Sequence, residues 1–139
     1  FDKGGYVPPV HQLHQIFKHW ESVKALKNHN PNAIYIASMF TWLRHYAPYM
    51  AARCIQDGWF DMAGFGRQSF AYPEFAKDIL EKGEMEKNKC CFSCSKCTDL
   101  MRTGHGTGCV LRDEYYTKLY QSIPQEKRPI NTTQIREKV

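Results

Sequence analysis

The placement of cysteine constrains this chain more than any other feature, because five of its six cysteines lie between Cys90 and Cys109. Within that stretch, Cys91, Cys94 and Cys97 repeat as C-x2-C-x2-C. Cys109 follows the glycine-rich segment 103–108, which can fold the chain back on itself. Thiols gathered in this way are typical of a metal centre and not of core packing.

The spacing favours a four-iron, four-sulfur cluster over a single zinc ion. The irons of such a cluster occupy separate corners, so closely spaced cysteines can each bind a different iron while a remote cysteine binds the last. A zinc ion needs four ligands on one tetrahedron, and zinc sites more often use two separated C-x2-C pairs. The expected ligands of a 4Fe-4S cluster are therefore Cys91, Cys94, Cys97 and Cys109, and zinc is the alternative.

Two questions about the cysteines stay open at this point. Cys90 offers a thiol next to Cys91 and is an alternative first ligand, although we favour Cys91. Disulfides are less favoured, because no signal peptide or long apolar segment is visible and only Cys54 lies outside the cluster region. We expect a reducing cytoplasm and a buried, inert thiol at Cys54, which lies in a helical pattern among alanines.

Length and charge limit the classes of function. A chain of 139 residues is long enough for one ordinary domain and too short for two well-packed ones. The net charge of +5 is spread along the chain without a basic stripe, so we expect no nucleic-acid partner. No apolar run of membrane length is visible, so we expect no membrane partner. The chain begins at Phe1 without a methionine, which suggests a fragment.

The hydrophobic pattern predicts alternating helices and strands. Predicted helices cover about 13–28, 42–57 and 73–82, and predicted strands cover 33–37 and 59–65. Such alternation indicates parallel strands joined by crossover helices. Because two parallel strands alone leave amides and faces unsatisfied, the chain should be part of a larger sheet or should complete one with another chain.

A second group of residues follows the two predicted strands. Gly64-Phe65-Gly66-Arg67 ends the second strand just before a helix, and Ser38-Met39-Phe40 follows the first strand. Parallel strands end at the same edge of a sheet, where exposed amides and an arginine can bind phosphate. By itself the G-x-G-R sequence is a weak signal, since a tight turn also needs glycine.

Residues 33–80 resemble the last two strand-helix units of the old yellow enzyme family barrel. The resemblance is carried by Ile-Tyr-Ile-Ala-Ser at 34–38, by Ala-Arg-Cys-Ile-Gln-Asp-Gly at 52–58 and by Asp-Met-Ala-Gly-Phe-Gly-Arg-Gln-Ser-Phe-Ala-Tyr-Pro at 61–73. The cysteine segment is similar to that of the iron-sulfur branch of the NADH:flavin oxidoreductase family, the branch of 2,4-dienoyl-CoA reductase and trimethylamine dehydrogenase. Ser38-Met39-Phe40 departs from the pattern, because the family usually has glycines there.

The resemblance implies an α/β fold, with residues 1–86 as the carboxyl-terminal portion of an FMN-binding TIM (β/α)8 barrel. Residues 87–115 would then form an iron-sulfur segment and 116–139 a polar tail. The residues implied to bind the flavin phosphate are Ser38, Met39, Phe40, Gly66 and Arg67. The residues implied to bind the 4Fe-4S cluster are Cys91, Cys94, Cys97 and Cys109.

The implied activity is that of an FMN- and 4Fe-4S-dependent oxidoreductase in which the cluster relays electrons to or from the flavin. NAD(P)H is the implied electron donor and a small organic molecule the substrate, and the family's catalytic residues belong to earlier strands. The implied partner is the remainder of the barrel, and self-association stays open. The alternative is a small metal-binding or electron-transfer module that carries no flavin.

Overall fold

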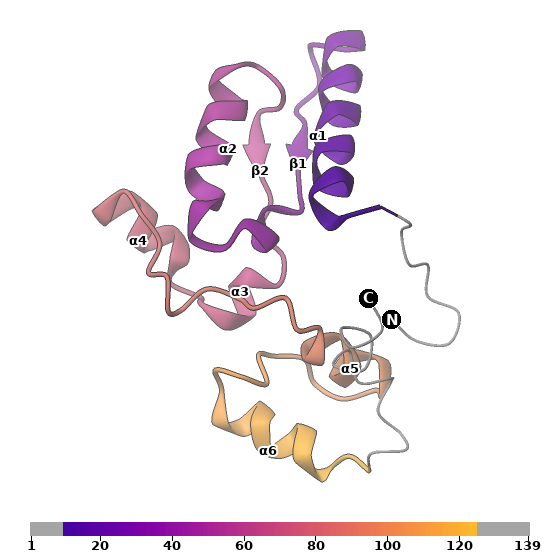
Figure 1. Cartoon of the computed structure of the whole chain (residues 1–139), viewed down its shortest axis with the longest axis vertical. Coiled ribbons are helices and arrows are strands. Elements are labelled where there is room, and N and C mark those ends of the chain that lie inside the picture. The colour runs from indigo at the N-terminus through magenta and orange to yellow at the C-terminus, as the bar shows by residue number, and fades with distance from the viewer. Residues whose placement is uncertain (1–9, 125–139) are drawn as a thin grey trace. The chain divides into compact units, whose positions relative to one another are not determined.

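The computed structural model describes residues 10–124, which divide into two compact units (Figure 1). Residues 10–92 form the N-terminal unit and residues 93–124 the C-terminal unit. The expectations for residues 1–9, and for the tail from residue 125 onward, lie outside the described residues.

Helices make up most of the described chain, and one short pair of strands accompanies them. The N-terminal unit contains α1 (Gln12–His29), β1 (Ile36–Ala37), the 3-10 helix η1 (Phe40–Tyr46), α2 (Ala47–Gln56), β2 (Met62–Ala63), α3 (Gln68–Ala71) and α4 (Phe75–Lys82). The C-terminal unit contains α5 (Lys96–Arg102) and α6 (Glu114–Ser122). The described part therefore agrees with the broad α/β class predicted from the sequence.

The two strands are parallel, as predicted, with Ile36 paired to Met62 and Ala37 to Ala63. Both are shorter than the predicted ranges 33–37 and 59–65. At their start, the side chain of Asp61 accepts a hydrogen bond from the Tyr35 amide, which takes that amide out of the ladder. At their end, the Gly64 amide donates to the Ala37 carbonyl over 2.6 Å, so the strands leave the sheet side by side.

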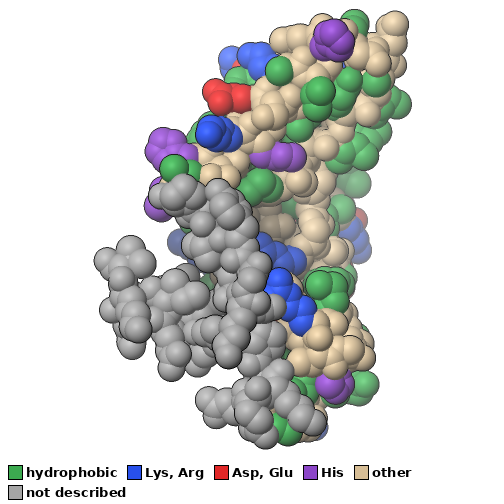
Figure 2. All heavy atoms as spheres, turned by 90° about the vertical axis from the view of Figure 1, so that its right-hand side faces the viewer, with side chains coloured by type: hydrophobic (Ala, Val, Ile, Leu, Met, Phe, Trp, Pro, Cys, Tyr) green, Lys and Arg blue, Asp and Glu red, His purple; other side chains and the backbone are tan. Residues whose placement is uncertain are grey.

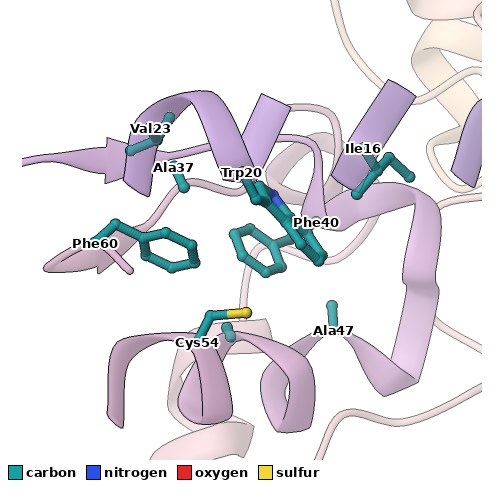
Figure 3. Close-up of a cluster of buried hydrophobic side chains, with 9 residues drawn as sticks. Ile16, Trp20, Val23, Ala37, Phe40, Ala47, Cys54 and Phe60 are labelled. Carbon is teal, nitrogen blue, oxygen red and sulfur yellow. The ribbon is translucent and has the colours of Figure 1, made fainter. Parts of the chain in front are cut away.

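The core of the N-terminal unit is built on stacked aromatic rings (Figure 3). Trp20 from α1 stacks on Phe40 at 4.5 Å between ring centroids, and Phe60 meets Phe40 edge-on. All three side chains are buried. Cys54 of α2 lies in the same core, as predicted, and burial raises the pKa of its thiol.

Two helix ends carry residues that commonly occupy such positions, although α2 and α4 begin later than the predicted starts at residues 42 and 73. Pro48 lies in the first turn of α2, where a missing amide costs no hydrogen bond. Gly83 ends α4 in the left-handed conformation, at φ 75°. The 3-10 helix η1 was not predicted, because its aromatic-rich sequence resembles the start of a longer α-helix.

The C-terminal unit has a core of its own. Leu100, Val110 and Ile123 are buried, and aromatic side chains of α6 pack against them. Asp113 caps α6 by accepting hydrogen bonds from the amides of Tyr115 and Tyr116. Neither α5 nor α6 was predicted from the sequence.

Several large apolar side chains of the N-terminal unit are exposed. Figure 2 shows hydrophobic side chains on the visible face, interspersed with basic side chains and histidines. On the sheet, Ile36 and its register partner Met62 are 61% and 51% exposed, whereas Ala37 is buried. One face of the strand pair is therefore covered by the helical core, and the other presents apolar side chains to solvent.

None of the helices within residues 10–124 combines the length and the apolar character needed to cross a lipid bilayer.

The aromatic core yields a prediction about stability. Replacing Phe40 with Ala removes the ring that Trp20, Phe60 and Phe65 all contact, so the free energy of unfolding should fall by about 3–5 kcal/mol. Leu80→Ala is the control, because Leu80 is 87% exposed and its loss should change stability by less than about 0.5 kcal/mol. Urea denaturation measures both, and equal effects would contradict the central place of Phe40.

Candidate functional site

The carboxyl ends of β1 and β2 lie at one edge of the strand pair. Because Ala37 pairs with Ala63 and the Gly64 amide bonds the Ala37 carbonyl, segments 38–40 and 64–67 start next to one another. The structure thus brings together the two turns that the sequence analysis singled out for phosphate binding. We refer to these two segments as the turn pair.

The backbone of the turn pair leaves amide groups available to a ligand. Met39 has φ 73°, so this methionine adopts a left-handed backbone conformation that is usually found at glycine. Among the described residues, the amides of Met39 and Gly66 donate no hydrogen bond. Gly66 is exposed, and no heavy atom lies within 4 Å of where its Cβ would stand. An oxyanion that needs open backbone donors fits this edge.

Ser38 differs from its neighbours, because side chains of α1 form hydrogen bonds with its amide, its hydroxyl and its carbonyl. The Nε2 atom of His19 lies 3.2 Å from both the amide and the hydroxyl of Ser38. The indole of Trp20 donates to the Ser38 carbonyl over 2.8 Å. Ser38 therefore anchors the turn, and Met39 and Gly66 carry the open amides. No sequence signal marked His19 for this role.

All six cysteines lie in the described residues and none forms a disulfide. Cys90 is fully buried against Tyr72 and Met85, and its thiol donates to the carbonyl of Glu86 over 3.4 Å. Cys91 is attached to α3, because its amide donates to Oε1 of Gln68 over 3.0 Å. Cys90 and Cys91 are both buried, so the choice of Cys91 as the first ligand stays a prediction.

The other expected ligands belong to the C-terminal unit, where Cys94, Cys97 and Cys109 are half-buried. Ser93 and Ser95, on either side of Cys94, both have left-handed backbones at φ 53° and 63°. Strained conformations of this kind concentrate at functional loops.

Cys97 lies in the first turn of α5, and Cys109 lies next to a close packing contact with α6. A Cβ on the preceding Gly108 would overlap the ring of Tyr116, so only glycine allows this packing.

Within residues 10–124, no three His, Cys, Asp or Glu side chains are arranged to hold a metal ion. Ligation by the four cysteines therefore stays a prediction. The donor set itself suits a 4Fe-4S cluster, because four thiolates are what such a cluster binds.

Two buried nitrogen donors beside the cysteine segment have no acceptor. Gln68 is fully buried, and while its Oε1 binds the Cys91 amide its Nε2 makes no hydrogen bond. The guanidinium of Arg44 lies 4.6 Å from the ring centroid of Phe92 and donates to the Lys87 carbonyl, yet its buried Nε makes no hydrogen bond. Buried donors without acceptors are rare in native proteins and point to a missing partner.

A polar network on α4 supports the core that contains Cys90. The Tyr72 hydroxyl donates to the buried carboxylate of Asp78, which also pairs with Lys82 at 2.8 Å. The hydrogen bonds from Lys82 and Tyr72 lower the pKa of Asp78. Burial and the bond to Asp78 raise the pKa of Tyr72 to about 12.

Comparison of the chain with protein-family profiles, with curated proteins and with solved structures found no match.

The Asp78 network predicts how stability depends on pH. The folded-state pKa of Asp78 is lowered, so its contribution is complete above the unfolded pKa of about 4 and is lost as pH falls through the folded value. Asp78→Asn should therefore be less stable than wild type at neutral pH, and the difference should shrink below about pH 4. Glu81→Gln is the control, because Glu81 forms only an exposed ion pair. Thermal melts of wild type and Asp78→Asn at pH values between about 2 and 7 test this prediction. A stability difference between the two proteins that stays constant with pH would contradict it.

Proposed function

We propose that this chain is the carboxyl-terminal part of an FMN- and 4Fe-4S-dependent NADH:flavin oxidoreductase of the old yellow enzyme family's iron-sulfur branch. The observation that carries the proposal is the hydrogen bond from the Cys91 amide to Gln68. Gln68 begins α3 directly after Gly66 and Arg67, so this bond attaches the cysteine segment to the turn that would bind the flavin phosphate.

The strand pair supports the barrel part of the proposal. Ile36 and Met62 are exposed on the face opposite the helices, and each strand has an edge without a neighbour in the described residues. In a TIM barrel, that face packs inside the barrel and both edges pair with further strands. Strands supplied by the preceding part of the protein would bury this apolar face.

The turn pair supplies the groups that a flavin phosphate needs. The amides of Met39 and Gly66 are open donors, and the guanidinium of Arg67 can pair with a phosphate through two hydrogen bonds. His19 and Trp20 fix the turn by holding Ser38 on its amide and carbonyl sides. When bound, FMN supplies both two-electron exchange with an organic substrate and one-electron exchange with a cluster.

The six cysteines divide into two structural thiols, Cys54 and Cys90, and four proposed ligands. Cys90 packs in a core with Tyr72 and Met85 and its thiol donates to the Glu86 carbonyl, so we assign it a structural role. The proposed ligands are Cys91, Cys94, Cys97 and Cys109.

A second candidate function is favoured by one observation. The C-terminal unit has its own hydrophobic core and carries three of the six cysteines, which is what a small metal-binding module requires. In that case the protein would bind iron or zinc and no flavin. The two experiments below separate these candidates.

Iron analysis tests the metal. The protein prepared without oxygen should contain about four irons and about four acid-labile sulfides per chain. It should also absorb broadly near about 400 nm, which is typical of these clusters. Cys91→Ser should lose most of this iron, whereas Cys90→Ser should keep it while lowering stability. Zinc in place of iron in the anaerobic protein would contradict the cluster, and equal iron loss in both variants would contradict the assignment of Cys91.

Flavin retention tests the turn pair in the full-length protein. Arg67→Ala should weaken FMN binding by about ten- to a hundredfold, because a charge-assisted contact to phosphate is lost. Arg53→Ala is the matched control, since Arg53 forms an exposed ion pair with Asp57 at the end of α2 and its loss should leave FMN bound. Equilibrium dialysis with FMN measures both, and a wild-type protein that retains no FMN would favour the flavin-free module.

A further inference from the structure

We propose that Gln68 and Arg44 form the hydrogen-bonding shell of Cys91 and raise the reduction potential of the cluster that this cysteine binds. The inference rests on the proposed function, because it needs a cluster at Cys91. It goes further by assigning two residues that lie outside the cysteine motif and outside the turn pair.

Gln68 places a buried carboxamide next to the main chain of Cys91. Its side chain is fully buried in the N-terminal unit, and its carboxamide lies at the main chain of Cys91, which donates to Oε1 over 3.0 Å. The other end of the same carboxamide, Nε2, has two N–H donors and makes no hydrogen bond in the described structure. A thiolate or sulfide bound at Cys91 would give this buried donor an acceptor.

Arg44 approaches the same segment from η1. Its backbone has φ 54° and ψ −130°, a strained conformation for a residue other than glycine. Its guanidinium covers the ring of Phe92 and donates to the Lys87 carbonyl over 3.4 Å, so it lies along the segment that contains Cys91. Its Nε is buried without an acceptor, like Nε2 of Gln68.

Together these groups provide what stabilises a reduced cluster. A 4Fe-4S cluster held by four thiolates is anionic and gains one more negative charge on reduction. Hydrogen bonds to its sulfurs and a nearby cation favour the reduced form, and they raise the potential. Gln68 supplies neutral donors and Arg44 supplies a fixed positive charge.

Gln68→Glu is the sharpest test, because the change leaves a carboxylate oxygen for the Cys91 amide but removes both N–H donors. The variant should assemble the cluster, and its iron content should be close to that of wild type. Reduction of its cluster should be at least tenfold less favourable, which is about 59 mV for a one-electron couple. Gln56→Glu is the matched control: it adds the same charge at an exposed position of α2 and should leave the potential unchanged.

Arg44 provides a second variant that does not bury a new carboxylate. Arg44→Gln should also lower the potential, and Arg44→Lys, which keeps the charge, should lower it less. Pulsed electron paramagnetic resonance of the reduced cluster gives a direct readout. Nitrogen-labelled glutamine should show a hyperfine coupling in wild type that is absent in Gln68→Glu.

The outcomes separate the inference from the proposed function. Potentials of Gln68→Glu and Arg44→Gln that match that of Gln56→Glu, with iron retained, would overturn the inference and leave the proposed function standing. A wild-type protein without iron would overturn both. Gln68→Glu could lose its cluster while circular dichroism shows that it remains folded. In that case, a lowered potential in Arg44→Gln together with the labelled-glutamine coupling in wild type supports the inference. The absence of both overturns it.

Discussion

The contact on which the N-terminal unit depends is made by one side chain, Trp20. Its indole ring stacks on Phe40, and its N–H donates to the carbonyl of Ser38 two residues before that ring. A single residue of α1 therefore fixes both the backbone leaving β1 and the aromatic side chain that follows it. A ladder of only two residue pairs is too short to do this by itself.

Rigid packing around Phe40 explains how the chain tolerates two strained residues nearby. Met39 and Arg44 both have positive φ, at 73° and 54°, and neither is glycine. Such conformations cost of order 1–3 kcal/mol each and persist only where their surroundings determine them. Here the buried Phe40 lies between them in sequence and holds the start of η1 against α1 and β2. Met39 is also the residue whose amide is open, and the strain at Arg44 accompanies its approach to Phe92.

The hydrophobic pattern and the positions of glycine and proline predicted many of the helices and strands of the N-terminal unit. Alternating apolar runs indicated parallel strands, and the predicted end of the third helix at residue 82 agrees with α4, which ends at Lys82. The turn pair could also be predicted, because parallel strands must end at one edge. These features depend on local sequence and on a general rule of topology, so a single sequence contains them.

Other features depend on contacts between residues that are far apart in the sequence, and no local pattern predicted them. His19 reaches Ser38 over 19 positions and Gln68 reaches Cys91 over 23. In the sequence each is an ordinary polar residue on a helix. Neither α5 nor α6 was predicted, since their apolar residues are few and the cysteines around α5 obscure the helical period. Whether the four cysteines bind a cluster is likewise set by chemistry that a pattern of spacing only suggests.

The two buried donors connect the stability of the cysteine segment with the occupancy of its site. Nε2 of Gln68 and Nε of Arg44 have no acceptor in the chain itself, and each such group opposes folding by about 1–3 kcal/mol. An anionic group bound at Cys91 that accepts from both would remove this penalty in the folded state alone, so binding would stabilise the fold beyond its own ligand bonds. The same penalty disfavours a neutral or apolar occupant. Under the proposed function, these two buried nitrogens would therefore favour an anionic sulfur centre over a neutral occupant.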